Sequence, residues 1–396
     1  MKSHRWQLPD GVDELLPPVA RQMEHLRREV LDVFHRWGFD LIDPPLLEYL
    51  DSLLVASGGD LDLQTLKATD QRSGRLLGIR ADLTSQAVRV DAQHGSSDDV
   101  SRLCYAAPVV FANPVGVHES RVPMKAGAEI FGVPGLEADA EIVALMQQVL
   151  RQGGLDDVVL VLGHMGLFRA LLERADLDEQ AAAALFAAVQ LKSETDICAL
   201  VPAGVLRDQL VALPQLMGDR AVLDDARRAL GAGSAAAGHA IDELEVLSEL
   251  ITARLPGTSL RYDLSELAGF GYHTGPLYAA YHRRQGRALA RGGRYDGVGA
   301  AFGRNRPATG FDVHLKPLLS TQQSFRPATA VWVGAQALQN SAADARTALL
   351  RQVDALRAAG RRVVMGLAAT EAPPADCQSV LTLKDGQWYE QPLTGR

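Results

Sequence analysis

The chain has 396 residues, of which 47% are hydrophobic, so it is roughly two to three times as long as a typical domain and has enough apolar side chains for more than one core. Its 48 acidic and 40 basic residues leave a net charge of −8, which excludes a globally basic surface for nucleic acid but allows a local basic patch. No stretch reaches the ~20 apolar residues of a membrane helix, and the N-terminus lacks a signal or transit pattern, so we expect a cytoplasmic protein without a membrane span.

The first part of the chain, residues 1–165, is predicted to hold a helix and most of a sheet. Apolar residues recur at helical spacing from Pro18 to Trp37, and Gly38 ends this pattern, which predicts an amphipathic helix. Segments with strand character and turn signals follow, and a second helix is expected from Asp139 to Gln152. The predicted strands are LLGIR at 76–80, RLCYAAPVVFA at 102–112, KAGAEIFGV at 125–133 and VVLVLGH at 158–164. Their order indicates a mainly antiparallel sheet backed by helices.

Composition divides the rest of the chain into three further parts. Residues 166–255 contain alanine-rich helical stretches such as EQAAAALFAAVQ, so we expect an inserted helical subdomain there. Strand and turn character returns at 256–320, where we expect the sheet to be completed. After a polar linker, residues 326–396 read as strand, helix, strand and a hairpin that turns at Asp385 and Gly386. This order predicts a small α/β domain.

The three cysteines, Cys104, Cys198 and Cys377, lie far apart and show neither a CxxC pair nor Cys/His spacing. We therefore expect three reduced, buried thiols and neither a disulfide nor a metal site. The sequence predicts no cofactor.

Five segments occur together in an order and spacing that are known from one family. They are LPDGVDELLPP, PPLLEYLDSL, IRADLTSQ, YAAPVVFANP with AGAEIFG, and FGYHTG with ARGGRYDG and TGFDVHL. With them the chain resembles histidyl-tRNA synthetase, a class II aminoacyl-tRNA synthetase, over about residues 8–320. The resemblance implies an α+β fold, with an antiparallel six-stranded sheet flanked by helices, the helical insertion and the small C-terminal α/β domain. It also implies a dimer that forms through a surface near residues 38–54.

The residues with which these synthetases bind and activate ATP differ in this chain. The resemblance aligns Phe111 with an arginine that holds the α-phosphate, and Asn113 with a carboxylate that faces the nucleotide. Pro317 stands where an arginine stacks on the adenine, and Ala268 stands where a further arginine stabilises the charge of adenylation. A positioned cation of this kind is worth on the order of 3 kcal/mol. We therefore predict that the chain has no catalytic residues and does not activate an amino acid with ATP.

The positions with which the synthetases hold the imidazole of histidine are largely kept. Glu129, Tyr272 and Tyr295 occupy them, and His273 stands in place of one aromatic residue. A buried carboxylate beside phenolic hydroxyls suits both nitrogens of an imidazole ring, because the two kinds of group can accept and donate hydrogen bonds. The resemblance therefore implies a histidine-binding pocket.

The positions at the amino-acid end of this pocket are altered more. Thr84 is kept, Asp82 replaces a glutamate and Lys125 replaces a glutamine. Asp82 can still face the ammonium group of an amino acid. Lys125 either faces the carboxylate of the ligand, in place of the arginine that is missing at Ala268, or pairs with Asp82.

A chain with a histidine pocket but without the ATP-binding arginines resembles the regulatory subunit of ATP phosphoribosyltransferase, a paralogue of histidyl-tRNA synthetase. The resemblance implies a non-catalytic subunit that forms a class II-type dimer and joins a separate short catalytic subunit in a hetero-octamer. It implies that the catalytic subunit needs this chain for activity, and that L-histidine inhibits the first step of histidine biosynthesis through it. Such allosteric coupling requires only differential binding, commonly about 1–3 kcal/mol.

Two other functions are alternatives. A divergent aminoacyl-tRNA synthetase or amino-acid ligase would need cations from elsewhere, such as Lys316 or Arg291. An RNA-binding role is disfavoured, because residues 326–396 hold eight Lys/Arg, six Asp/Glu and few aromatic residues, too few for a platform that stacks bases; we expect no tRNA partner. The sequence leaves open which surface contacts the catalytic subunit, and whether histidine binds in this pocket or at an interface.

Overall fold

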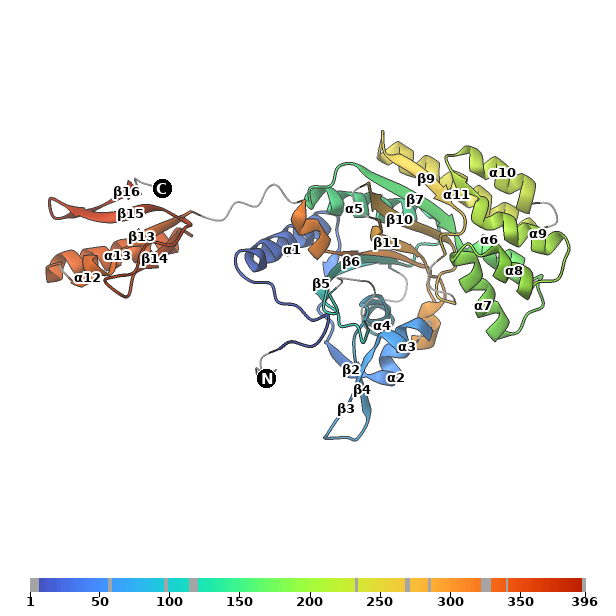
Figure 1. Cartoon of the computed structure of the whole chain (residues 1–396), viewed down its shortest axis with the longest axis horizontal. Helices are drawn as coiled ribbons and strands as arrows, with labels where there is room; N and C mark the ends of the chain where they lie inside the picture. The colour runs from blue at the N-terminus through green and yellow to red at the C-terminus, as the bar shows by residue number, and fades with distance from the viewer. Residues whose placement is uncertain are drawn as a thin grey trace. The chain divides into compact units, whose positions relative to one another are not determined.

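The computed structural model divides into two compact units, Met1–Gln323 and Ser324–Arg396 (Figure 1). Each unit has its own hydrophobic core. The structure describes residues 7–55, 59–95, 99–113, 120–231, 234–267, 271–283, 286–321, 329–339 and 341–393.

The first unit is built on a nine-stranded sheet. In spatial order its strands are β1 (Asp40–Leu41), β5 (Ser101–Pro108), β6 (Met124–Phe131), β12 (Ala308–His314), β11 (Ala288–Arg294), β10 (Pro276–His282), β7 (Val158–His164), β9 (Ser259–Asp263) and β8 (Met217–Gly218). Neighbouring strands run antiparallel, except that β1 pairs with β5 and β7 pairs with β9 in parallel. The expected mainly antiparallel sheet is therefore confirmed, although it has nine strands instead of the expected six, and the segment at 256–320 completes it.

The two faces of the central strands carry different side chains. In β6, Ala126, Ala128 and Ile130 belong to the main core, whereas Lys125 and Glu129 lie on the opposite face, as the two-residue period of a strand requires. That second face is partly covered by α4 (Thr84–His94), which contacts β5 and β6. The polar residues of β6 therefore lie between the sheet and α4.

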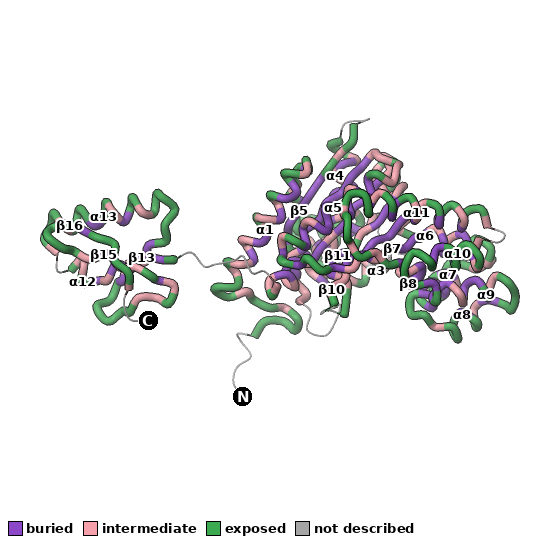
Figure 2. Tube along the Cα trace, turned by 90° about the horizontal axis from the view of Figure 1, so that it is seen from above, coloured by how far each residue is buried: buried purple, intermediate pink, exposed green. Residues whose placement is uncertain are grey.

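Three long helices cover the face that carries the main core. They are α1 (Val19–Arg36), α5 (Leu136–Gln152) and α11 (Ala235–Arg254). The helix predicted from Pro18 to Trp37 is confirmed. Figure 2 shows many buried residues along α5, which packs on the sheet and contacts both α1 and α11. Helix α5 begins before its predicted start at Asp139, because the chain is extended only up to Gly135.

The segment at 166–255 is largely helical, as predicted. Its further helices are α6 (Met165–Leu172), α7 (Glu179–Gln190), α8 (Glu194–Leu200), α9 (Val205–Ala212) and α10 (Ala221–Leu230). Asp178 and Ser193 cap α7 and α8, because their side chains accept hydrogen bonds from backbone N–H groups of the first turn. The short strand β8 was not predicted. Cys198 corrects another expectation: it lies on an exposed face of α8, whereas Cys104 and Cys377 are buried.

A separate three-stranded sheet holds the strand that we predicted at 76–80. It consists of β2 (Leu47–Tyr49), β4 (Leu76–Ile79) and β3 (Leu66–Thr69), and α2 (Leu50–Leu54) packs against it. The strand is real, but its expected place in the main sheet is wrong. Local pairing decides its position, since β3 and β4 form an antiparallel pair along the chain and Gly78 leaves space for the side chain of Leu53.

The second unit has the predicted α/β order. Its sheet runs β14 (Arg362–Met365), β13 (Ala330–Val333), β15 (Cys377–Lys384) and β16 (Gln387–Pro392), with α12 (Ala335–Gln339) and α13 (Ala343–Ala358) as its helices. The hairpin of β15 and β16 turns at Asp385 and Gly386, both with positive φ, as a two-residue turn requires. Trp388 in β16 donates a hydrogen bond from its Nε1 to the carbonyl oxygen of Ala345 over 2.7 Å and so ties the hairpin to α13.

Candidate functional site

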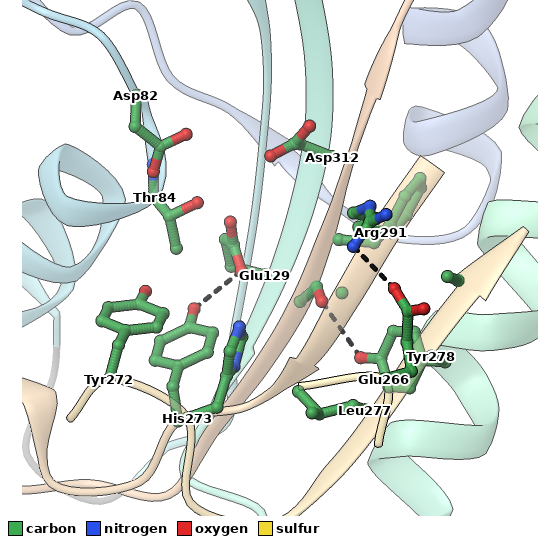
Figure 3. Close-up of a pocket in the computed structure, with 15 residues that line it drawn as sticks. Asp82, Thr84, Glu129, Glu266, Tyr272, His273, Leu277, Tyr278, Arg291 and Asp312 are labelled. Carbon is green, nitrogen blue, oxygen red and sulfur yellow. Dashed lines mark hydrogen bonds and ion pairs between the residues drawn. The ribbon is translucent and has the colours of Figure 1, made fainter. Parts of the chain in front are cut away.

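A cavity of about 190 Å³ lies on the polar face of the main sheet. Figure 3 shows its lining, which comes from the start of α4 and the segment before it, from strands β6, β10, β11 and β12, and from loops next to β10 and β11. Six of the seven positions predicted for histidine binding line this cavity: Asp82, Thr84, Glu129, Tyr272, His273 and Tyr295. These six residues come from positions as far apart in the chain as 82 and 295 and meet in one cavity.

Glu129 forms the polar floor of the cavity and is 1% exposed. The hydroxyl of Tyr105 donates to its Oε1 over 2.9 Å, and the hydroxyl of Tyr295 donates to its Oε2 over 2.7 Å. Thr84 extends the chain of hydrogen bonds, because its Oγ1 lies 3.3 Å from the Tyr105 hydroxyl. Both carboxylate oxygens are thus held in place by neighbouring strands and loops.

Tyr105 lies in the strand predicted at 102–112 but was not among the residues predicted for the pocket. Its pairing provides the missing signal: Tyr105 lies opposite Gly127 across β5 and β6, two residues before Glu129. A Cβ atom on Gly127 would lie 2.5 Å from the Tyr105 hydroxyl. The glycine therefore gives the tyrosine ring room to cross β6 and reach Glu129.

Burial raises the pKa of Glu129 to about 8, although the hydroxyls of Tyr295 and Tyr105 oppose part of this shift. At pH 7 the group is then mainly a neutral carboxylic acid that still has a proton to donate. Such an acid can share its proton with a neutral imidazole nitrogen. The floor of the cavity therefore suits a ligand with a ring nitrogen that accepts a proton.

Two further polar atoms at the cavity lack a hydrogen-bond partner among the described residues. They are the hydroxyl oxygen of Tyr272 and the Nδ1 of His273, and both are buried. The Tyr272 ring stacks on Tyr295 with 5.1 Å between ring centroids and 21° between ring planes. Burial lowers the pKa of His273 to about 4, so its ring is neutral at pH 7. Because unpaired buried polar atoms destabilise a protein, these two atoms favour a ligand with matching polar groups.

Lys125, the seventh predicted position, does not line this cavity. Its Nζ lies 3.3 Å from Oδ1 of Asp82 and 3.0 Å from Oδ2 of Asp312. Burial alone would lower the pKa of this amine, but Asp312 and Asp82 outweigh that effect and raise it. Lys125 was expected either to face the ligand carboxylate or to pair with Asp82. In the structure it pairs with Asp82 and also with Asp312.

A second cavity, of about 560 Å³, lies beside the first and shares Arg291 and Asp312 with it. Phe111 and Pro317 both line it, although they are far apart in the chain. The Phe111 ring stacks on His314 with 6.4 Å between centroids and 29° between planes. Asn113 is exposed and does not belong to this lining. Ala268 lies outside the described residues.

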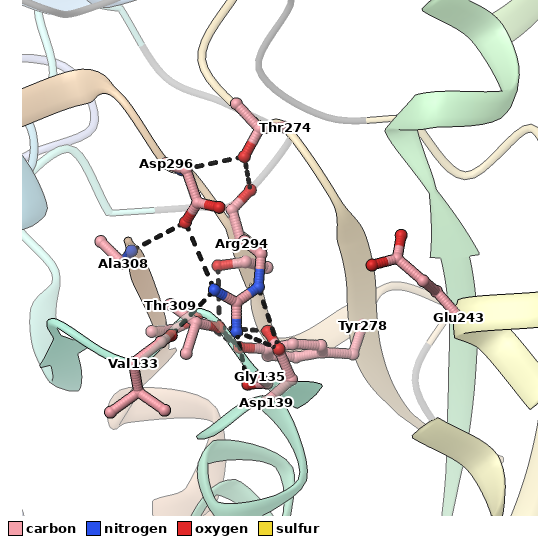
Figure 4. A network of polar contacts seen from close by, with 12 residues as sticks. Val133, Gly135, Asp139, Glu243, Thr274, Tyr278, Arg294, Asp296, Ala308 and Thr309 are labelled. Atoms are coloured by element: carbon pink, nitrogen blue, oxygen red, sulfur yellow. Dashed lines mark hydrogen bonds and ion pairs between the residues drawn. The ribbon is translucent and has the colours of Figure 1, made fainter. Parts of the chain in front are cut away.

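Arg294, which the sequence reasoning also missed, holds the segments around the cavity together (Figure 4). It is buried, and its guanidinium donates to the carboxylate of Asp139 at the start of α5 and to the carbonyl oxygens of Val133 and Gly135. Its own carbonyl oxygen accepts from the backbone N–H of Thr274 over 2.8 Å. Arg294 directly precedes Tyr295, and Thr274 directly follows His273. The network therefore holds the backbone next to both of these lining residues in place.

Within the described ranges, every helix is too short or too polar to span a bilayer. The same ranges contain no group of three or more histidine, cysteine, aspartate or glutamate side chains placed to hold a metal ion.

Comparison with known proteins gives matches over nearly the whole chain. The family model of histidyl-tRNA synthetase matches residues 11–318, and that of the ATP phosphoribosyltransferase subunit HisZ C-terminal domain matches residues 340–389. The ATP phosphoribosyltransferase regulatory subunit of Thioalkalivibrio sulfidiphilus is 45% identical and covers 96% of both chains. The regulatory subunit of Chromohalobacter salexigens is 44% identical over 98% of both chains.

Solved structures match the fold. A protein of Bacillus halodurans described as an ATP phosphoribosyltransferase regulatory subunit/histidyl-tRNA synthetase is 26% identical, with a TM-score of 0.80 over 94% of this chain and 96% of that one. A histidyl-tRNA synthetase from a Nostoc species has a TM-score of 0.75 at 17% identity, over 98% of this chain and 97% of that one, which shows the class II fold alone. On these matches, the chain belongs to the family of ATP phosphoribosyltransferase regulatory subunits, which share the fold of histidyl-tRNA synthetase.

Proposed function

We propose that this chain is a non-catalytic regulatory subunit of ATP phosphoribosyltransferase and that it binds L-histidine in the first cavity. A separate short catalytic subunit joins ATP to phosphoribosyl pyrophosphate in the first step of histidine biosynthesis. The chain supports the activity of that subunit and transmits feedback inhibition by histidine. The observation that carries the proposal is the buried Glu129 between two tyrosine hydroxyls, beside the unpaired polar atoms of Tyr272 and His273.

The polar groups of the cavity match the chemistry of histidine. Glu129 can share a proton with one imidazole nitrogen, while the Tyr272 hydroxyl is available for the other nitrogen. Asp82 lines the same cavity, and a carboxylate there attracts the ammonium group of an amino acid. The cavity volume of about 190 Å³ suits a small ligand.

The absence of amino-acid activation rests on the second cavity. Phe111 and Pro317 supply no charge there, although the resemblance places ATP-binding arginines at both positions. One observation favours the alternative, an amino-acid ligase: Lys125, Arg287 and Arg291 also line this cavity. Lys125 is already paired with two carboxylates and Arg291 with Glu266, so neither is held ready for a phosphate. Robust exchange of pyrophosphate into ATP with histidine as substrate would favour the ligase instead.

Self-association is expected at the surface around β1 and β2. Several apolar side chains are exposed there: Leu41, Leu46, Leu47, Tyr49 and Leu76. Strand β1 is also an edge of the main sheet, and an exposed edge with apolar neighbours favours pairing with a second copy. We infer that a dimer formed here is the unit from which a hetero-octamer with the catalytic subunit is assembled, without tRNA.

Reconstitution tests this function directly. The short catalytic subunit is expected to form product only when this chain is added, and histidine is expected to inhibit that reaction. Calorimetric titration of the chain alone should show binding of histidine but not of ATP. Histidine inhibition that is unchanged in Glu129→Gln would place the effector site outside this cavity.

A further inference from the structure

Histidine carries a carboxylate, and the charges of the first cavity point to one residue as its partner. Among the described residues that line this cavity, the acidic ones are Asp82, Glu129, Glu266 and Asp312, and the one lysine or arginine is Arg291. Lys125 neutralises Asp82 and Asp312 only in part, and Glu129 is mainly uncharged at pH 7. None of these acidic groups attracts a carboxylate, which loses its hydration on binding. It therefore needs a cation that faces the cavity.

Lys125 cannot serve this purpose at low cost. It is 8% exposed and is paired with both Asp82 and Asp312. Turning it toward a ligand would leave two carboxylates without their cation in a buried setting, which is strongly unfavourable. The lysine thus neutralises the lining and does not bind the ligand.

Arg291 is in the opposite situation. Its side chain is 52% exposed, and its Nη1 makes a 2.7 Å ion pair with Oε1 of Glu266, whose side chain is 21% exposed. An ion pair with this much contact with water contributes little to stability. In Figure 3 the guanidinium of Arg291 lies between Glu266 and Asp312, at the side of the cavity away from Tyr272. Exchange of Glu266 for a ligand carboxylate at this point replaces one charge-assisted hydrogen bond with another.

We propose that Arg291 binds the α-carboxylate of the ligand and that Glu266 occupies this arginine in the free protein. This inference rests on the proposed binding of histidine in the first cavity. It assigns the two ends of the ligand to opposite sides of the cavity, with the imidazole at Glu129 and the carboxylate at Arg291. Glu266 is then a competitor within the protein that lowers the affinity for any amino acid.

The test compares histidine with histidinol, which has a hydroxymethyl group in place of the carboxylate, by calorimetric titration of the full-length chain. Wild-type protein is expected to bind histidine at least about tenfold more tightly than histidinol. Arg291→Gln should weaken the binding of histidine by on the order of 10- to 100-fold, because the charge-assisted hydrogen bond to its carboxylate is lost. The affinity for histidinol, which has no carboxylate, should change by less than about threefold. Glu266→Gln should tighten histidine binding by roughly two- to fivefold. In wild-type protein the Tyr281 hydroxyl donates to Oε2 of Glu266 over 3.1 Å, and the amide oxygen of the glutamine can still accept this hydrogen bond.

Arg287→Gln is the matched control, because Arg287 lines the second cavity but not the first; it should leave the preference for histidine intact. Thermal unfolding of each variant checks that the fold is kept. An unchanged preference in Arg291→Gln would overturn the assignment while leaving histidine binding in place. A wild-type chain that binds neither compound would overturn the proposed function, and the assignment with it.

Discussion

Gly310 lies directly opposite Glu129 in the pairing of β12 with β6, and a Cβ atom on Gly310 would lie 1.4 Å from Oε2 of Glu129. The glutamate side chain thus lies across the neighbouring strand, in space that any residue other than glycine would fill. This close approach places the carboxylate between Tyr105 and Tyr295. The glycine is therefore as much a part of the pocket as the acid.

Gly310→Ala is expected to abolish histidine binding and to destabilise the first unit by about 1–3 kcal/mol, since overpacking forces a buried side chain from its place. Calorimetric titration and urea unfolding measure the two effects. Gly238→Ala is the control: Gly238 lies within α11 with nothing within 4 Å of the added Cβ. Alanine should stabilise that helix by roughly 0.5–1 kcal/mol. Retention of full histidine affinity in Gly310→Ala would contradict the placement of Glu129.

Glu129 is expected to make the protein less stable as the pH rises. Its pKa is about 8 in the folded chain, against an ordinary value of 4.5, so the unfolded chain loses this proton first. The folded state is therefore favoured by this group below its unfolded pKa, and that contribution is lost between about pH 4.5 and pH 8 at about 1.4 kcal/mol per pH unit. Glu129→Gln removes the slope.

Urea unfolding of wild-type protein and Glu129→Gln at several pH values measures this difference. The stability of the variant relative to wild type should rise with pH and level off above about pH 8. Glu14→Gln, which removes an exposed carboxylate, is the control and should show no such rise. A constant difference between Glu129→Gln and wild type would mean that folding does not raise the pKa of this carboxylate.

Histidine affinity should show a plateau near neutral pH. The bound pair of Glu129 and imidazole shares one proton, and between the imidazole pKa of about 6.5 and the Glu129 pKa of about 8 the free partners also hold one proton. Binding in this window takes up and releases no proton. Above it Glu129 must regain a proton, and below it the imidazole must lose one, so affinity falls in both directions. Titrations in buffers with different heats of ionisation measure the proton exchange; proton uptake or release at pH 7 would contradict the shared-proton pair.

Arg294→Met is expected to destabilise the first unit by roughly 3–5 kcal/mol, because it leaves the buried carboxylate of Asp139 without its cation. Arg228→Met is the control. Arg228 pairs with Asp225 on an exposed part of α10, where its side chain is 72% exposed, and its loss should change stability by less than about 0.5 kcal/mol. Urea unfolding at pH 7 compares the two variants, and equal effects would show that the network around Arg294 adds no more than a surface pair.

Much of the local structure follows from short sequence patterns. The periodicity from Pro18 to Trp37 predicts α1, and the dipeptide Asp385–Gly386 predicts the hairpin of the second unit, because both depend on neighbouring residues alone. The motifs around Glu129, Tyr272 and Tyr295 likewise indicate that these three residues share one site, since each motif keeps its residue at a fixed place in the fold.

Tertiary structure alone decided how those residues are used. Lys125 pairs with Asp312, which lies 187 positions away in the chain, and Arg291 pairs with Glu266 in a loop that follows β9. Tyr105 in β5 reaches Glu129 only because Gly127, two residues before Glu129 in the neighbouring strand β6, leaves space for its ring. The sequence by itself therefore determined the family, most of the elements and six of the residues that line the first cavity. Strand register and burial determined which charges are already neutralised and which one can meet a ligand, because both depend on segments that come together only when the sheet forms.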